Sequence, residues 1–184
     1  GLISKEVPVS NWGSADNILS ALAPYSLDKP RDVWKTEQQL LVQVNTKTGA
    51  LSAAIYQHLE SGIAVAFWGR LDNRPDLIQQ LNCQQHAIDD ELIALAWLKW
   101  GEYCPEKLVG DFAFAVASPK TGVVFLARDV MGVRPLFYRA DAHGVFFANS
   151  AAAFKPLLLG ELTPSKQWMA HFILEISYQH TDTA

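Results

Sequence analysis

The side chains able to act as nucleophiles or metal ligands are few and widely spaced in this 184-residue chain. The two cysteines, Cys83 and Cys104, show no C-x-x-C spacing and have no histidine at the intervals of a metal site. These patterns predict neither a disulfide framework nor a metal centre, and Cys104 is expected to be a buried, reduced thiol. The five histidines are scattered and are interpreted as surface or turn residues: His58, His86, His143, His171 and His180.

Sequence signatures of several common enzyme classes are missing from the chain. It contains no G-x-S-x-G elbow, Walker A loop, G-x-G-x-x-G turn, H-E-x-x-H pair or EF-hand loop. Each of these patterns would position a nucleophile, a phosphate group or a metal ion. The sequence therefore gives no support to the mechanisms that depend on them. The neighbours Arg128 and Asp129 are interpreted as an ion pair that fixes the turn at Gly132 rather than as catalytic groups.

Four helices are predicted around these polar residues. Ser14 caps an apolar 3–4 spacing that Pro24 ends, which predicts a short first helix. Pro75 occupies the favoured first position of a helix that reaches Leu81. Three carboxylates at 89–91 favour the positive end of a helix that continues to Trp100, and the apolar spacing at 168–176 predicts a final helix.

The remaining apolar runs have the length and composition of strands. They lie at 40–44, 53–56, 63–67, 112–116, 123–127, 135–138 and 145–148. Turn sequences at 119–122 and 141–144 join the last four runs into two hairpins. The segment 26–35 lacks periodicity and is interpreted as a surface loop. This arrangement predicts an α+β domain with sheets packed together and helices outside.

Composition limits the class of protein further. With 49% hydrophobic and 18% charged residues the chain is that of an ordinary globular domain, and its length suits one domain over 1–184. A net charge of −4 without a Lys/Arg stripe argues against nucleic acid as a partner. No apolar run reaches the ~18 residues of a membrane helix, and the first residues do not resemble a signal peptide, so a cytoplasmic location without membrane contact is expected.

Four blocks of sequence resemble the N-terminal domain of asparagine synthetases, a class II glutamine amidotransferase domain. They occur in the family's order and spacing, at 67–74, 89–91, 100–115 and 127–138 followed by 147–150. The resemblance is clear from Phe67 to Leu159. It implies the four-layer αββα sandwich of N-terminal-nucleophile hydrolases. The Gly-Arg-Leu-Asp-Asn-Arg segment at 69–74 is similar to the branch of the family that contains lasso-peptide cyclases and β-lactam synthetases.

The resemblance also implies which residues would handle glutamine. Family members use an N-terminal cysteine as nucleophile with its own α-amine as base, whereas position 1 here is Gly1. Trp68 stands where the family has an asparagine that stabilises the oxyanion, and the Arg-Gly-Pro-Asp segment that holds the glutamine carboxylate is not recognisable. Gly69 and Asp89 match substrate-binding positions, although a turn glycine and a helix N-cap are the favoured explanations of these two residues.

Three functions remain open on the sequence. The first is a scaffold domain with a vestigial pocket at Trp68, Gly69 and Asp89 and no catalytic residue, in a protein whose synthetase domain forms an amide bond with ATP and Mg²⁺. The second is an active glutaminase whose cysteine precedes Gly1. The third is a free-standing module that binds glutamine or another amino acid. The expected partners are a C-terminal synthetase domain and a second copy in a homodimer, and no cofactor is expected in this domain.

Overall fold

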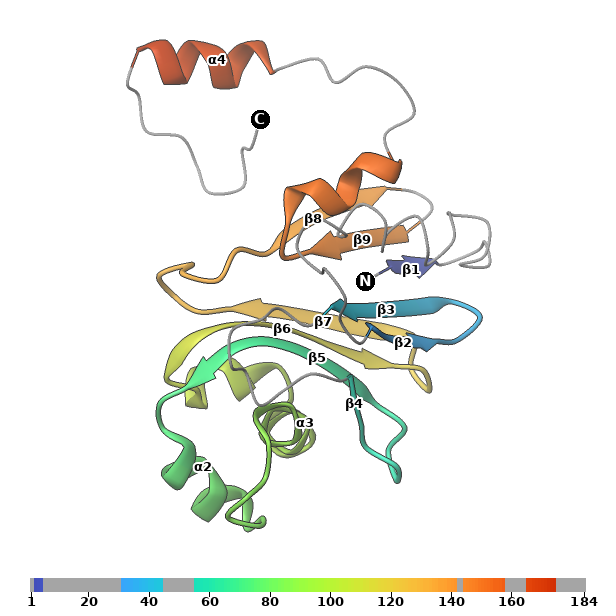
Figure 1. Ribbon diagram of the computed structural model, residues 1–184, viewed down its shortest axis with the longest axis vertical. Helices are drawn as coiled ribbons and strands as arrows, with labels where there is room; N and C mark the ends of the chain where they lie inside the picture. Colours follow the sequence, from blue (N-terminus) through green and yellow to red (C-terminus); the bar gives the residue numbers. More distant parts are fainter. Residues whose placement is uncertain (1, 5–30, 45–54, 142–143, 158–164, 175–184) are drawn as a thin grey trace.

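A computed structural model describes residues 2–4, 31–44, 55–141, 144–157 and 165–174 of the chain (Figure 1). The expected helix at 14–22 lies outside these residues. Two antiparallel sheets stack on each other, and helices cover the outer face of one of them (Figure 1). The mixed α+β class predicted from the sequence is therefore confirmed. Within the described part of the chain, no helix is both long and apolar enough to cross a membrane.

The first sheet has five strands in the order β2-β3-β1-β9-β8. Its strands are β1 (Leu2–Ser4), β2 (Arg31–Lys35), β3 (Gln39–Val44), β8 (Phe137–Asp141) and β9 (Gly144–Ala148). The expectation of a loop through residue 35 was wrong for 31–35, which pair with β3. The charged residues of β2 obscure the alternation of apolar and polar positions by which a strand is predicted. Its Trp34 packs into the core, while Asp32 accepts a hydrogen bond from the Ile55 backbone N–H at 2.7 Å.

The second sheet has four strands in the order β4-β5-β6-β7. They are β4 (Tyr56–Gln57), β5 (Ala64–Leu71), β6 (Gly110–Ser118) and β7 (Val123–Arg128). The predicted hairpin is confirmed as the β6–β7 pair, and the second predicted hairpin is confirmed as β8–β9. The long β5–β6 pairing, from Ala64 opposite Ala117 to Leu71 opposite Gly110, forms the centre of the domain.

The two faces of β6 carry side chains of different size. Phe112, Phe114 and Val116 pack with the helices, whereas Ala115 and Ala117 pack with side chains of the five-stranded sheet. Because successive strand residues point to opposite faces, this alternation builds two core layers from one strand. The small alanines allow the sheets to approach, and each buried phenylalanine contributes roughly 1.5–3 kcal/mol through the removal of apolar area from water.

The predicted helices at the middle of the chain are confirmed as α2 (Arg74–Leu81) and α3 (Asp89–Trp100). Both cover the outer face of the four-stranded sheet (Figure 1). Asn82 ends α2 in the left-handed conformation, and a 3₁₀ helix, η3 (Gly101–Lys107), links α3 to β6. A second 3₁₀ helix, η4 (Ala151–Leu157), follows β9. The last predicted helix is α4 (Lys166–Ile173), which buries none of its side chains and lies apart from the sheets (Figure 1).

Candidate functional site

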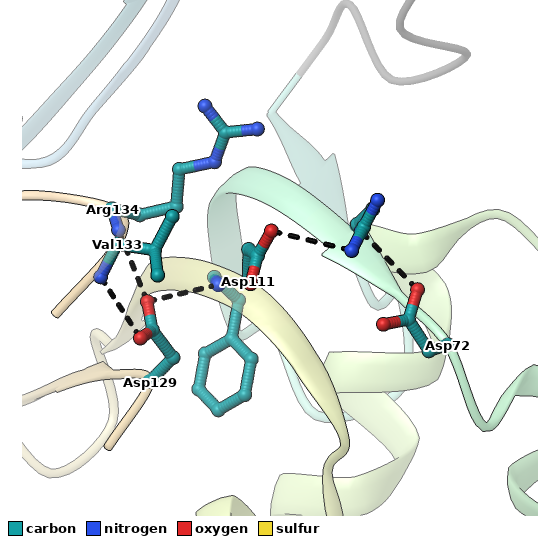
Figure 2. A network of polar contacts seen from close by, with 7 residues as sticks. Asp72, Asp111, Asp129, Val133 and Arg134 are labelled. Atoms are coloured by element: carbon teal, nitrogen blue, oxygen red, sulfur yellow. Dashed lines mark hydrogen bonds and ion pairs between the residues drawn. The ribbon is translucent and has the colours of Figure 1, made fainter. Parts of the chain in front are cut away.

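The connection between β5 and α2 is held at several points by its own polar side chains. Asn73 donates to the Lys107 carbonyl at 2.9 Å and accepts from the Val109 N–H at 3.0 Å. The Arg70 guanidinium lies 3.2 Å from the Asp72 carboxylate and 3.4 Å from that of Asp111 (Figure 2). Residues 70–73 therefore fasten the end of β5 to the start of β6.

Asp89 lies at the start of α3 and is paired within the protein. It is the first helical residue, because Ile88 occupies the N-cap position. Its carboxylate forms a salt bridge with Arg74 of α2, whose guanidinium also donates to the Ala87 carbonyl at 2.5 Å. The Asp89 side chain is largely buried, with 18% of its area exposed. The charge that would attract a substrate ammonium is thus already neutralised by an internal cation.

Gly69 is required by the packing of two strands. Its φ is +149°, a conformation that residues with a side chain rarely adopt. A Cβ atom at this position would lie 2.1 Å from the Asp111 carbonyl oxygen and 2.7 Å from the Phe112 Cα. Gly110 on β6 is restricted in the same way, because a Cβ atom added there would lie 2.3 Å from the Arg70 carbonyl oxygen. Close approach of β5 and β6 alone therefore explains glycine at position 69.

Trp68 adjoins Gly69 on β5 and is covered by an arginine. The Arg134 Cζ atom lies 4.9 Å from the centre of the Trp68 ring, which is a cation–π contact. Next to it on β5, the Phe67 carbonyl accepts a hydrogen bond from the Gln43 side chain of β3 at 3.3 Å. Trp68 thus stacks with Arg134, and its neighbour Phe67 forms a hydrogen bond that links the two sheets. No hydrogen bond or ion pair of the described residues joins Asp89 to Trp68 or Gly69.

Arg134 ends a tight loop that is organised by the buried carboxylate of Asp129. That carboxylate accepts the backbone N–H groups of Val133 at 2.9 Å, Arg134 at 3.0 Å and Phe112 at 3.3 Å (Figure 2). Burial alone would raise the pKa of Asp129, but these donors outweigh it and lower the pKa below its ordinary value. The expected ion pair with Arg128 is not among the salt bridges of the described residues. The backbone holds the turn instead.

Both cysteines are reduced and unsuited to nucleophilic attack. Cys104 is fully buried, and burial raises the pKa of its thiol to about 12. The pKa of the Cys83 thiol is also raised, mainly by burial and further by the charge of Glu91. Because the thiolate is the reactive form, the raised pKa lowers the reactive fraction of both groups at neutral pH. The prediction of a buried, reduced Cys104 is confirmed.

Comparison with known proteins places the chain in a family. A family model described as "Glutamine amidotransferase domain" matches residues 41–156, which is more than half of the chain. The chain therefore belongs to the glutamine amidotransferase domain family. It is a class II domain related to asparagine synthetases, as the relatives below indicate.

Two relatives illustrate the extent of the similarity. The chain is 33% identical over 93 residues to asparagine synthetase [glutamine-hydrolyzing] 3 of Bacillus subtilis, a match that covers 48% of the chain and 15% of that protein. It is 44% identical over 54 residues to putative asparagine synthetase [glutamine-hydrolyzing] 1 of Methanocaldococcus jannaschii, covering 29% of the chain and 10% of that protein. The aligned part of the chain thus spans only a small fraction of either relative.

A solved structure supports the fold independently. The glutamine phosphoribosylpyrophosphate amidotransferase of B. subtilis, in complex with ADP and GMP, superposes with a TM-score of 0.57 at 18% identity. The superposition covers 77% of the chain and 40% of that protein. The architecture is therefore similar to that of an amidotransferase.

Sequence reasoning missed several residues of this site. The sequence shows Arg134 only as part of a block, and its contact with Trp68 joins positions that are distant along the chain. The sequence likewise shows Asn73 only as part of a block, although an asparagine two residues before Pro75 is a signal of a structured turn. The backbone donors around Asp129 follow from the path of the loop, which no side-chain pattern specifies.

Proposed function

We propose that this chain is the amidotransferase-type domain of an asparagine-synthetase-like, amide-forming enzyme and that it does not hydrolyse glutamine. The observation that carries the proposal is the Trp68–Arg134 contact at the position that the family resemblance assigns to an oxyanion-stabilising asparagine. An indole offers a single N–H donor, and here its ring face is occupied by a guanidinium. Loss of one oxyanion donor costs about 10²–10³ in rate.

The pairing of Asp89 supports the same proposal. A glutamine α-ammonium that approached this carboxylate would compete with Arg74, which already forms a salt bridge with it. The ligand would also bring a second positive charge beside that guanidinium, and like charges at short range repel. Asp89 in this arrangement joins α2 to α3, which supports a pocket that has lost its affinity for glutamine.

The described thiols add a third line of support. A family nucleophile needs a thiolate and a free α-amine on the same residue. Cys83 and Cys104 are internal residues with raised pKa values, so neither meets that requirement. A cysteine that precedes Gly1 would meet it, and this is the alternative that an assay must separate. Even then, Trp68 and the Asp89 salt bridge would leave an altered pocket.

The proposal extends to the architecture and to the rest of the protein. The two stacked sheets, with helices on the outer face of the four-stranded one, support the four-layer αββα sandwich that the resemblance implies. In this proposal ATP and Mg²⁺ act in a separate synthetase domain, which is the main partner of this one. The sequence of residues 69–74 favours the branch of the family that contains lasso-peptide cyclases and β-lactam synthetases. In that branch an amine of the substrate takes the place of glutamine-derived ammonia.

Glutamine labelled with ¹⁵N in its side-chain amide tests the proposal. The full-length protein should release no ¹⁵N-ammonium above a buffer blank, with or without ATP. Release that iodoacetamide abolishes would show an active glutaminase and overturn the proposal. Trp68→Asn serves as a matched variant, because restoring the family's residue alone should leave the protein inactive. Glutamine binding with no amide formation in any ATP-dependent assay would instead support a free-standing binding module.

A further inference from the structure

Arg134 carries a positive charge that no acidic group neutralises among the described residues. Asp111 is engaged by Arg70, and the oxygens of Asp129 are taken by backbone N–H groups. The Nε atom of Arg134 is buried without a hydrogen-bond partner. A buried donor left unpaired costs about 1–3 kcal/mol, and more when it is charged, so this arrangement is stabilised by any ligand that supplies an acceptor.

The guanidinium is also held ready for such a ligand. Two hydrogen bonds to Asp129 fix the backbone at Val133 and Arg134, while the Arg134 side chain points away from that carboxylate (Figure 2). The Trp68 ring supports the guanidinium from β5, where its neighbour Gly69 is locked against β6. The Arg134 side chain is thereby ordered before a ligand arrives, which reduces the entropy that is lost on binding.

We propose that Arg134, stacked on Trp68, is a binding site for an organic carboxylate. The forked donors of a guanidinium match the two oxygens of a carboxylate, and such charge-assisted bonds are the strong ones. The terminal nitrogens make no hydrogen bond with described residues, so they engage the ligand first, and a small turn of the side chain adds Nε. The Trp68 ring and the exposed side chain of Val133 provide apolar surface for the carbon skeleton of the ligand.

The charge of the surroundings favours a monoanion. Arg134 is the one cation in contact with Trp68 among the described residues, and the chain carries a net charge of −4. A phosphate dianion is better matched by several cations or by a helix N-terminus. The α-carboxylate of an amino acid or peptide therefore suits the site. This inference goes beyond the proposed function, because it holds whether or not the domain hydrolyses glutamine.

Fluorine NMR of the full-length protein labelled with 5-fluorotryptophan provides a direct probe of the site. The Trp68 resonance is assigned by its loss in Trp68→Phe. Sodium acetate and glutamine should shift it saturably, whereas sodium chloride at equal ionic strength and glutaminamide, which lacks the carboxylate, should not. Arg134→Gln should weaken acetate binding about 10- to 100-fold, because it removes a charge-assisted pair of hydrogen bonds.

The matched control is Arg128→Gln, at the end of β7 just before the same loop. Arg128 is exposed and forms no ion pair with the described residues, so its removal should change acetate affinity less than about two-fold, as expected for a screened surface charge. Unchanged resonances of the other tryptophans show that each variant is folded. The proposal is overturned if acetate gives no saturable shift, if Arg134→Gln and Arg128→Gln weaken binding equally, or if phosphate or glutaminamide binds as well as acetate. Ammonium release measured on the same samples reports on the proposed function separately.

Discussion

Replacing Asp129 with asparagine is expected to destabilise the domain by about 2–4 kcal/mol at pH 7. The substitution keeps the size of the side chain but replaces one acceptor oxygen with an NH₂ group. One carboxylate oxygen accepts from Val133 and the other from Arg134 and Phe112. In either orientation the new NH₂ faces at least one backbone N–H, so a buried donor loses its partner and the remaining bonds lose their charge.

The size of this effect follows from the burial of the group. Asp129 is 5% exposed, so water cannot replace the lost acceptor. One unsatisfied buried N–H costs about 1–3 kcal/mol, and the loss of charge from the other bonds adds about 1 kcal/mol. Because Arg134 follows directly in the loop, its contact with Trp68 should weaken as well. The loop should become more accessible to proteases in the variant.

The destabilisation caused by Asp129→Asn should depend on pH, because only the ionised carboxylate is stabilised by the three backbone donors. The folded-state pKa of Asp129 is lowered, so its contribution is fully present above the unfolded value near 3.9 and is lost as the pH falls through the folded pKa. The difference in unfolding free energy between wild type and Asp129→Asn should therefore be constant from pH 7 to about pH 5 and shrink below about pH 4.

Urea denaturation followed by tryptophan fluorescence measures these differences. Asp72→Asn is the matched control, because Asp72 is about half exposed and its pair with Arg70 should contribute less than about 1 kcal/mol. An Asp129→Asn variant within about 0.5 kcal/mol of wild type, or a difference that grows on acidification, would refute the assignment of a buried, ionised anchor.

Two further predictions concern buried positions. Gly69→Ala should cost about 2–5 kcal/mol in urea unfolding, since the methyl group meets the Asp111 carbonyl and the backbone is strained; a change below about 1 kcal/mol would contradict the close approach of β5 and β6. Iodoacetamide at pH 8 should leave Cys104 unmodified in the native protein and modify it in urea, because a thiol with a pKa of about 12 is almost wholly protonated there. Rapid native labelling of Cys104, followed by peptide mass spectrometry, would disprove its burial.

Much of the fold could be predicted because local signals agreed with the tertiary structure. The acidic start of α3, Pro75 near the start of α2 and the turn at 119–122 each specify an element without help from distant residues. The strand β2 could not be predicted in this way. Its charged positions suggested a loop, and only pairing with β3 and the hydrogen bond from Ile55 to Asp32 make them compatible with a sheet.

The family could be predicted from the sequence, whereas the contacts of the site residues could not. Blocks of residues in a fixed order were sufficient to predict an amidotransferase domain, and the match over 41–156 confirms that prediction. The roles of Trp68, Gly69 and Asp89 as a vestigial pocket stay predictions. The structure adds what each one contacts, and those contacts depend on Arg134, Arg74 and the Asp111 carbonyl, which the folded chain brings together.

The proposal that this domain does not hydrolyse glutamine is tested most directly with a reagent that traps a glutamine-attacking nucleophile. A glutamine analogue with a diazoketone in place of the amide alkylates such a nucleophile irreversibly, and intact-mass spectrometry of the full-length protein detects the adduct. We expect an unchanged mass after prolonged incubation. A single adduct that maps to the N-terminal residue and that excess glutamine prevents would contradict the claim.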